Sequence, residues 1–358
     1  MSTTLAPDDV VRDWQDVDPG RRPPLVVADP LAAFLDAHGL GTGELSITPL
    51  GAGHSNVTLL VKRGDRTFVL RRGPRPPVPP AAHDMLREAR IVHALRDSGV
   101  PVAKVLATCD DSAVIGVPFY VMERAPGLTI TDVLPDGLEP GVVGNALVDV
   151  LAALHAVHPR DVGLQELTKP TGYVERQIRR FVGSWKHNRT REVPEVDLVT
   201  RWLGDHLPAA YETTIVHGDY RLGNTLFTSR PTRLQAVLDW ELATLGAPLA
   251  ALGYLLSMWS EPGDEPWAFD LSPVTRCVGF ASRRELVERY VGRSRREAED
   301  LRFYVVLALW KNVVIMEGNV RRALEGGSDD PFLRDFGDGV LDIARRAMRV
   351  GPGGQDIL

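Results

Sequence analysis

The segment that most constrains this chain is residues 215–227, Ile-Val-His-Gly-Asp-Tyr-Arg-Leu-Gly-Asn-Thr-Leu-Phe. It begins with a short apolar stretch, 215–216, and ends with another, 225–227, and each predicts a short strand. Gly218 and Gly223 permit a tight backbone between them. The pattern therefore predicts a polar loop that is held in place at both ends.

A second apolar run, 234–238, follows this loop closely. Ser229, Arg230 and Pro231 lie between the two runs and are typical turn residues. We therefore expect a hairpin in which 234–238 returns beside 225–227. Such a hairpin would bring Asp239 next to Asn224.

The polar residues of the loop have the order that phosphoryl transfer requires. That reaction needs a carboxylate to accept the proton of the acceptor hydroxyl, and an amide five residues later to hold a metal ion. Asp219 and Asn224 have this spacing, with Asp239 as the second metal ligand, and Arg221 can reach the γ-phosphate. We count His217, which opens the motif, with Asp219 and Arg221 as candidate catalytic residues. A His-Gly-Asp triplet alone is weak support, because it also occurs in ordinary turns.

With these motifs, His-Gly-Asp-Tyr-Arg-Leu-Gly-Asn and Leu-Asp-Trp-Glu, the sequence resembles the aminoglycoside phosphotransferase family. It is most similar to the subgroup related to the kinase-like domain of acyl-CoA dehydrogenase fusion proteins. The resemblance implies an α+β, protein-kinase-like fold with a small N-terminal lobe, built on an antiparallel sheet, and a larger, mainly helical C-terminal lobe. It also implies ATP and Mg2+ as cofactors, bound between the lobes, and a small-molecule hydroxyl acceptor.

The resemblance and the composition together divide the chain into three parts. Residues 1–24 are polar, Pro-rich and acidic, and we expect them to be poorly ordered. Residues 25–123 would form the nucleotide-binding N-terminal lobe, and 124–350 the catalytic and acceptor-binding C-terminal lobe. The family implies that the backbone near Met122 and Glu123, at the hinge, contacts adenine.

A Gly-rich turn between two apolar runs, residues 51–56, is a candidate phosphate loop. Its glycines, Gly51 and Gly53, would lay backbone N–H groups over the phosphates, with Ser55 and Asn56 as further donors. A simple hairpin turn remains the alternative.

The strand expected over 67–72 carries a candidate phosphate-binding cation, Arg71, at the position where kinase-like folds usually have lysine. Arginine binds phosphate bidentately, so the role survives the exchange. Glu88 lies in the apolar stripe of a helix expected over 82–97, and a buried carboxylate is costly unless it is paired. We predict an Arg71–Glu88 ion pair; a solvent-facing Arg71, or Arg72 as the cation, are the alternatives.

The chain departs from its relatives at Ala247 and Ala251, where the family typically has aspartates. The second aspartate is expected to accept backbone hydrogen bonds from the catalytic loop. Losing such a bond at a buried site costs about 1 to 3 kcal/mol. A pseudokinase-like binding module with impaired catalysis is therefore the alternative function.

The sequence constrains the identity of the acceptor less than it constrains the catalytic loop. Aminoglycosides require an acidic pocket, whereas the fusion-protein subgroup suggests a hydroxylated acyl or another small hydroxyl compound. The acidic, aromatic stretch 260–270 is a candidate border of the acceptor pocket. Helices expected over 283–292 and 297–323, rich in Trp and Val, favour a less charged acceptor.

Composition excludes several other classes. The net charge of −6 with scattered Lys and Arg argues against nucleic-acid binding. The two cysteines, Cys109 and Cys277, have no metal-ligand spacing. We see no signal peptide and no run of transmembrane length, so we expect a cytoplasmic protein with no membrane partner. No flavin-binding segment supports a dehydrogenase.

Overall fold

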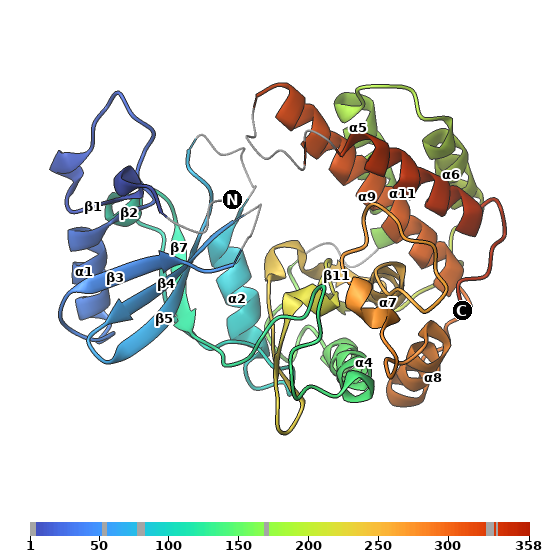
Figure 1. The fold of residues 1–358 in the computed structure, drawn as a ribbon, viewed down its shortest axis with the longest axis horizontal. Helices are drawn as coiled ribbons and strands as arrows, with labels where there is room; N and C mark the ends of the chain where they lie inside the picture. The colour runs from blue at the N-terminus through green and yellow to red at the C-terminus, as the bar shows by residue number, and fades with distance from the viewer. Residues whose placement is uncertain (1–4, 52–55, 77–82, 168–171, 327–332, 334–335) are drawn as a thin grey trace. The chain divides into compact units, whose positions relative to one another are not determined.

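The chain divides into an N-terminal unit, residues 1–96 and 102–125, and a C-terminal unit, residues 97–101 and 126–358. The computed structural model in Figure 1 describes all residues except 1–4, 52–55, 77–82, 168–171, 327–332 and 334–335. The first unit is built on a sheet and the second mainly on helices, as the sequence predicts.

An antiparallel sheet forms the centre of the N-terminal unit. Its strand order is β3-β4-β5-β7-β6. The strands are β3 (Leu45–Pro49), β4 (Val57–Arg63), β5 (Arg66–Arg72), β6 (Val105–Cys109) and β7 (Phe119–Glu123). Hairpins connect β3 to β4 and β4 to β5, so the first three strands of this sheet follow the chain.

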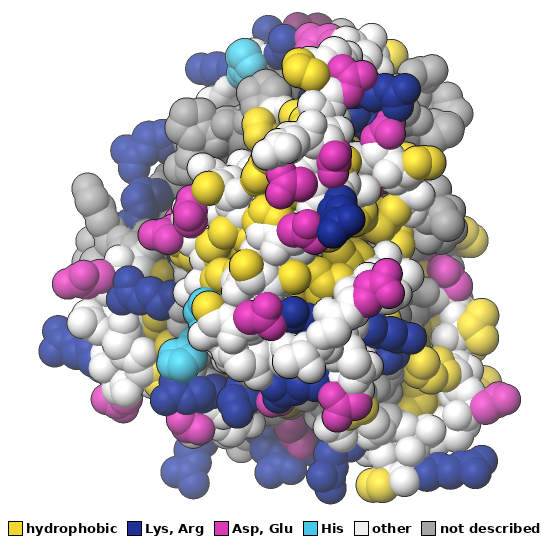
Figure 2. Space-filling view, turned by 90° about the vertical axis from the view of Figure 1, so that its left-hand side faces the viewer, with side chains coloured by type: hydrophobic (Ala, Val, Ile, Leu, Met, Phe, Trp, Pro, Cys, Tyr) yellow, Lys and Arg dark blue, Asp and Glu magenta, His cyan; other side chains and the backbone are white. Residues whose placement is uncertain are grey.

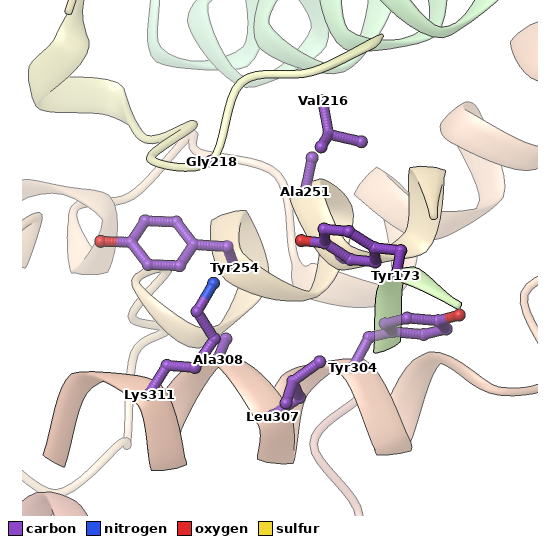
Figure 3. Close-up of a pocket in the computed structure, with 10 residues that line it drawn as sticks. Tyr173, Val216, Gly218, Ala251, Tyr254, Tyr304, Leu307, Ala308 and Lys311 are labelled. Atoms are coloured by element: carbon purple, nitrogen blue, oxygen red, sulfur yellow. The ribbon is translucent and has the colours of Figure 1, made fainter. Parts of the chain in front are cut away.

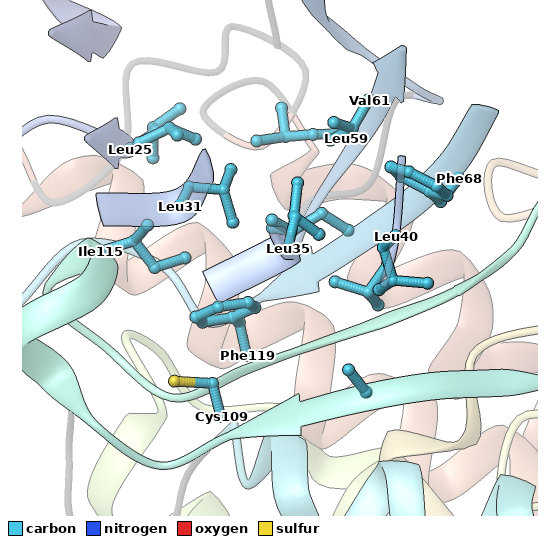
Figure 4. Packing of buried hydrophobic residues seen from close by; sticks show 14 residues of the cluster. Leu25, Leu31, Leu35, Leu40, Leu59, Val61, Phe68, Cys109, Ile115 and Phe119 are labelled. Carbon is cyan, nitrogen blue, oxygen red and sulfur yellow. The ribbon is translucent and has the colours of Figure 1, made fainter. Parts of the chain in front are cut away.

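Helices cover both faces of this sheet. Helix α1 (Ala28–Ala37) packs Leu31 and Leu35 on one face, against Phe68 and Leu70 of β5 (Figure 4). Helix α2 (Met85–Leu95) packs on the other face, where Met85 and Ala89 join Tyr120 of β7. Because strand side chains alternate between faces, Val69 and Arg71 of β5 lie on the α2 side.

The N-terminal segment that we predicted to be poorly ordered forms short regular elements. Strand β1 (Val10–Val11) pairs in parallel with β2 (Val26–Val27). Leu25 and Val26 are buried in the core of the unit. Burial of these apolar residues offsets the entropy of ordering a polar segment.

The C-terminal unit is a group of helices with two short two-stranded sheets. The helices are α4 (Pro140–Ala156), α5 (Tyr173–Asn188), α6 (Pro194–Asp205), α7 (Pro248–Ser257), α8 (Arg283–Ser294), α9 (Leu301–Leu324) and α11 (Gly337–Val350). Helices α5, α6, α7 and α11 all pack on α9. Helix α9 is therefore the centre of the unit.

Helix α9 is long and apolar enough to cross a membrane by composition, with a mean hydropathy of 1.3. The expectation that no run reaches transmembrane length is therefore wrong by length and composition. However, 78% of its most apolar window is buried within the structure. Its apolarity is thus explained by its place in the core, where a helix is apolar on all sides.

The two short sheets hold the predicted polar loop. Strand β8 (Thr214–Val216) pairs antiparallel with β11 (Thr244–Gly246), a strand that the sequence analysis did not anticipate. Strand β9 (Thr225–Thr228) pairs antiparallel with β10 (Arg233–Val237), and this confirms the predicted hairpin. The loop 217–224 is therefore anchored to a sheet on each side.

Charged side chains of both signs are interspersed on the surface in Figure 2, which shows one face of the molecule. On this face Lys and Arg do not gather into a single large patch. This mixture fits the modest net charge of −6.

Candidate active site

His217 anchors the loop from within. Its ring is fully buried; Nε2 lies 2.8 Å from the Leu238 carbonyl oxygen, and Nδ1 lies 3.2 Å from the backbone N of Asp219. The Asp219 N–H donates to Nδ1, so Nε2 carries the proton and donates to Leu238. Burial lowers the pKa of His217, which keeps the ring neutral. His217 thus ties the loop to the end of β10 and positions Asp219.

Gly218 is required at the next position. Its φ of +88° is one that side chains rarely adopt, and an added Cβ would lie 2.4 Å from the Leu242 carbonyl oxygen. The backbone therefore turns tightly against Leu242. This turn directs the following residue, Asp219, away from the buried histidine.

The carboxylate of Asp219 is held by two residues of the same loop. Asn224 Nδ2 donates to Asp219 Oδ2 at 2.7 Å and to the Asp219 carbonyl oxygen at 2.9 Å. Arg221 Nε lies 3.4 Å from Asp219 Oδ1. The side chains of Asp219 and Arg221 are each about one-fifth exposed, at 21% and 22%. Oδ1 itself is buried and accepts no hydrogen bond within the described residues, so the carboxylate is oriented and keeps an unused acceptor position.

The hairpin brings Asp239 to this loop. The Leu238 N–H donates to the Asn224 carbonyl oxygen at 2.8 Å, which joins the end of β10 to the loop. Asp239 itself has φ 64° and ψ 63°, a left-handed conformation that is uncommon for aspartate. Such backbone strain costs about 1 to 3 kcal/mol and is concentrated at functional sites. The charges of Asp219 and Asp239 both act on His217 and on Tyr254, so the two carboxylates lie in one neighbourhood.

The donor groups at this position fit Mg2+. Because the amide nitrogen of Asn224 is engaged by Asp219, its oxygen is the end left for a cation. No group of three or more His, Cys, Asp or Glu that could hold a metal occurs in the described part of the chain. An ion held by one carboxylate and one amide oxygen needs further ligands from phosphates and water, which is how Mg2+ is usually bound. Convergence of Asp239 and Asn224 on one ion stays a prediction.

In the N-terminal unit the predicted ion pair is confirmed. Arg71 Nε lies 2.9 Å from Glu88 Oε1, and the Glu88 side chain is only 1% exposed. Arg71 also donates to Thr58 Oγ1 at 3.2 Å. Arg72 points to the opposite face of the sheet, where it is fully buried and donates to backbone carbonyl oxygens, among them that of Gly73 at 3.0 Å. Arg72 therefore has a structural role, and a phosphate role for Arg71 stays a prediction.

Of the predicted phosphate ligands in the Gly-rich turn, the structure describes only Gly51 and Asn56. Gly51 is exposed two residues after the end of β3, and the buried Asn56 bonds through Oδ1 to His83 Nδ1 at 2.8 Å. Gly53 and Ser55 lie outside the described residues. A phosphate role for this loop stays a prediction.

The predicted adenine contacts fall at the end of β7. Met122 lies within the sheet, opposite Val69 and Val105. The Glu123 N–H donates to the Lys104 carbonyl oxygen at 2.8 Å, so this amide is already engaged. Contacts of Met122 and Glu123 with adenine stay a prediction.

A pocket opens beside Asp219 within the C-terminal unit (Figure 3). Its lining comes from α5, β8, the catalytic loop, α7 and α9. The lining residues are Tyr173, Val216, Gly218, Ala250, Ala251, Tyr254, Tyr304, Leu307, Ala308 and Lys311. The tyrosines of this pocket were missed in the sequence analysis; for Tyr254 the signal was its position one helical turn after Ala251.

Tyr254 joins this pocket to the catalytic loop. Its hydroxyl is close enough to Asp219 for the charge of that carboxylate to act on it. Burial raises the pKa of Tyr254 well above its usual value, and the charge of Asp219 raises it further. The phenol therefore stays protonated beside the catalytic loop.

The two alanines that replace family aspartates are both buried. Ala247 precedes α7 without a side-chain cap, and Ala251 lines the pocket. Without the family aspartate at position 251, the loop N–H groups need another partner. The structure provides one for Asp219, whose N–H bonds to His217. At least part of the loop is thus ordered without the family aspartate.

The acidic stretch 260–270 serves a structural role. Glu261 lies 3.2 Å from Arg283, which also pairs with Asp264 and donates to the Trp259 carbonyl oxygen at 2.9 Å. Asp270 pairs with Arg276. None of these acidic residues lines the pocket of Figure 3, so their charges do not make that pocket acidic.

Comparison with known proteins identifies the family. A sequence profile of the phosphotransferase enzyme family matches residues 46–273, more than half of the chain. The chain therefore belongs to this family. Acyl-CoA dehydrogenase family member 10 of Mus musculus is 33% identical over 323 residues, which cover 88% of this chain and 30% of that protein. The chain spans between 30% and 46% of the length of such curated relatives.

Solved structures agree on the fold. A Ralstonia eutropha protein, named as a candidate aminoglycoside phosphotransferase, is 31% identical with a TM-score of 0.78; the match covers 91% of this chain and 98% of that one. Aminoglycoside phosphotransferase APH(4)-Ia, in a ternary complex with AMP-PNP and hygromycin B, is 18% identical with a TM-score of 0.61, covering 91% and 100%. The fold is thus the two-lobed, kinase-like α+β fold.

Proposed function

We propose that this chain transfers the γ-phosphoryl group of ATP to a hydroxyl group of a small molecule. One observation carries this proposal: the carboxylate of Asp219 is oriented by Asn224 at 2.7 Å on a side chain that is one-fifth exposed, in a loop anchored on both sides. The membership of the family and the nucleotide analogue bound to the APH(4)-Ia neighbour support it.

In the proposed reaction Asp219 accepts the proton of the acceptor hydroxyl and aligns its oxygen for attack. Asn224 holds the carboxylate, which limits the geometries that the acceptor can adopt. Arg221, whose side chain is 22% exposed, is the group that would stabilise charge on the transferred phosphoryl group.

Asn224 and Asp239 are the residues that would hold Mg2+. When bound, the ion would neutralise charge on the phosphate oxygens. In the N-terminal unit Arg71 would contact the phosphates, and Glu88 fixes its Nε at 2.9 Å. Glu88 thereby sets the direction of the guanidinium.

The test measures ATP consumption and product formation with hydroxyacyl-CoA thioesters, aminoglycosides and choline-like alcohols. Wild-type protein should phosphorylate at least one of these classes, and D219N should not, although it binds nucleotide. Equal turnover by D219N would contradict the role of Asp219.

A second candidate is a pseudokinase-like module that binds a nucleotide or ligand without efficient transfer. The observation that favours it is the pair of alanines, Ala247 and Ala251, at the start of α7. This candidate predicts nucleotide-dependent stabilisation of the protein without phosphoryl transfer to any acceptor. Slow but Asp219-dependent transfer would eliminate it.

A further inference from the structure

His83, in the N-terminal unit, has a backbone conformation that is uncommon for a residue with a side chain. Its φ is +58°, in the left-handed region. It lies directly before Asp84, whose side chain caps α2 by accepting from the Arg87 N–H at 2.9 Å. Such backbone conformations are concentrated at functional sites. No step of the proposed reaction uses His83.

The side chain of His83 is hydrogen-bonded to the candidate phosphate turn. Its Nδ1 lies 2.8 Å from Oδ1 of Asn56, a residue that is only 3% exposed. Because an amide oxygen can only accept, Nδ1 carries the proton and donates. A Cβ added to Gly73 would lie 3.5 Å from the His83 Cβ, so the chain after β5 passes close to the same side chain. His83 thus lies beside the residue before β4, the residue after β5 and the start of α2.

Further contacts close a ring through these three elements. Glu88, in the first turn of α2, lies 2.9 Å from Arg71 of β5. Arg71 donates to Thr58 Oγ1 at 3.2 Å, and Thr58 lies on β4, two residues after Asn56. The link from α2 back to Asn56 is the His83 hydrogen bond. The two predicted phosphate ligands, Asn56 and Arg71, are therefore joined both through the sheet and through α2.

We propose that His83 is a positioning residue of the nucleotide site: its Nδ1–H fixes the amide of Asn56 and holds the candidate phosphate turn in register with Arg71. This inference rests on the proposed function and adds a residue to its nucleotide site. An amide that is held by its oxygen presents its nitrogen, the donor end, in a fixed direction. Phosphate oxygens accept from such a donor, whereas a reversed amide would present its oxygen to them.

Three substitutions separate the hydrogen bond from the backbone conformation. H83N keeps both, because asparagine tolerates the left-handed region and its Nδ2 is a donor in the place of the ring Nδ1. H83G keeps the backbone conformation and lacks the donor. H83D has the size of H83N, but its carboxylate can only accept. H93N, at an exposed histidine of α2, is the matched control.

Calorimetry measures the binding of AMP-PNP and of adenosine, which has no phosphates, and thermal midpoints are recorded on the same preparations. H83G should bind AMP-PNP about tenfold more weakly than wild type, with an unchanged affinity for adenosine. H83N and H93N should bind both compounds as wild type does. The double variant N56A/H83G should bind AMP-PNP no more weakly than N56A, because the link is already lost in N56A.

Four outcomes would each overturn the inference: wild-type affinity of H83G for AMP-PNP, an equal loss for adenosine, additive losses in N56A/H83G, or no binding of AMP-PNP by wild type. If the thermal midpoint shows that H83G does not fold, the comparison is made between H83D and H83N. Equal affinities of these two variants for AMP-PNP would then overturn it.

Phosphoryl transfer from ATP to the hydroxyl compounds of the proposed function is measured separately. If AMP-PNP binding depends on His83 as expected but wild type transfers phosphate to no acceptor, the proposed transfer fails while the positioning role stands. If wild type transfers phosphate and H83G has an unchanged KM for ATP, the transfer stands and the positioning role fails.

Discussion

Two cationic side chains, one in each unit, differ in whether a carboxylate lies within ion-pair distance. Arg71 in the N-terminal unit is fixed by Glu88 at 2.9 Å, and the pair is nearly buried. Lys311 in the C-terminal unit is half-buried and has no carboxylate within ion-pair distance in the described part of the chain. In the proposed function Arg71 meets the phosphates of ATP at every turnover, so a rigid partner is useful.

The largest effect is expected for substitution of Asp219, which the acceptor hydroxyl must reach. D219N should lower kcat by about 10² to 10⁴, because the amide cannot accept the hydroxyl proton. The folded state should change little, since the amide can still accept from Asn224. Turnover and the thermal midpoint are measured on the same preparation. A loss of activity that is accompanied by unfolding would leave the catalytic role unsupported.

The next largest effect is expected for the Arg71–Glu88 ion pair. E88A should destabilise the N-terminal unit by about 3 to 5 kcal/mol, because it leaves the charge of Arg71 buried without a partner. The double variant R71M/E88M should recover most of that stability but should not restore nucleotide binding. Urea denaturation and nucleotide titration measure the two quantities. Equal destabilisation by the single and double variants would show that the pair is not the source of the effect.

A smaller effect, of opposite sign, is expected for the unpaired cation. The pKa of Lys311 is about 8 in the folded protein and 10.5 in the unfolded chain, so the unfolded state binds more protons between these values. Stability should therefore rise with pH from about 8 to 10.5 in wild type. K311M should be more stable by about 1 to 3 kcal/mol at pH 7 and gain little at pH above 10. The exposed Lys62 is the matched control, and K62M should change little.

Much of the fold and of the catalytic loop could be predicted from the sequence, because the signals are local. The hairpin of β9 and β10 follows from two apolar runs and a turn, and the structure confirms it. The Arg71–Glu88 pair follows from a carboxylate within an apolar helical stripe, which has to be paired. The short elements at 7–16 and strand β11 were missed, because two or three residues carry no periodic signal.

The sequence by itself determined the loop chemistry of this protein: the order His217, Asp219, Asn224 is set by spacing, and neighbouring strands hold it. Only the tertiary structure decided what faces that loop. Lys311 and Tyr254 are distant in sequence, and they reach one pocket because α7 and α9 pack together. Whether a cation is paired or free depends on which helices surround it, and this is a property of packing that no local pattern encodes.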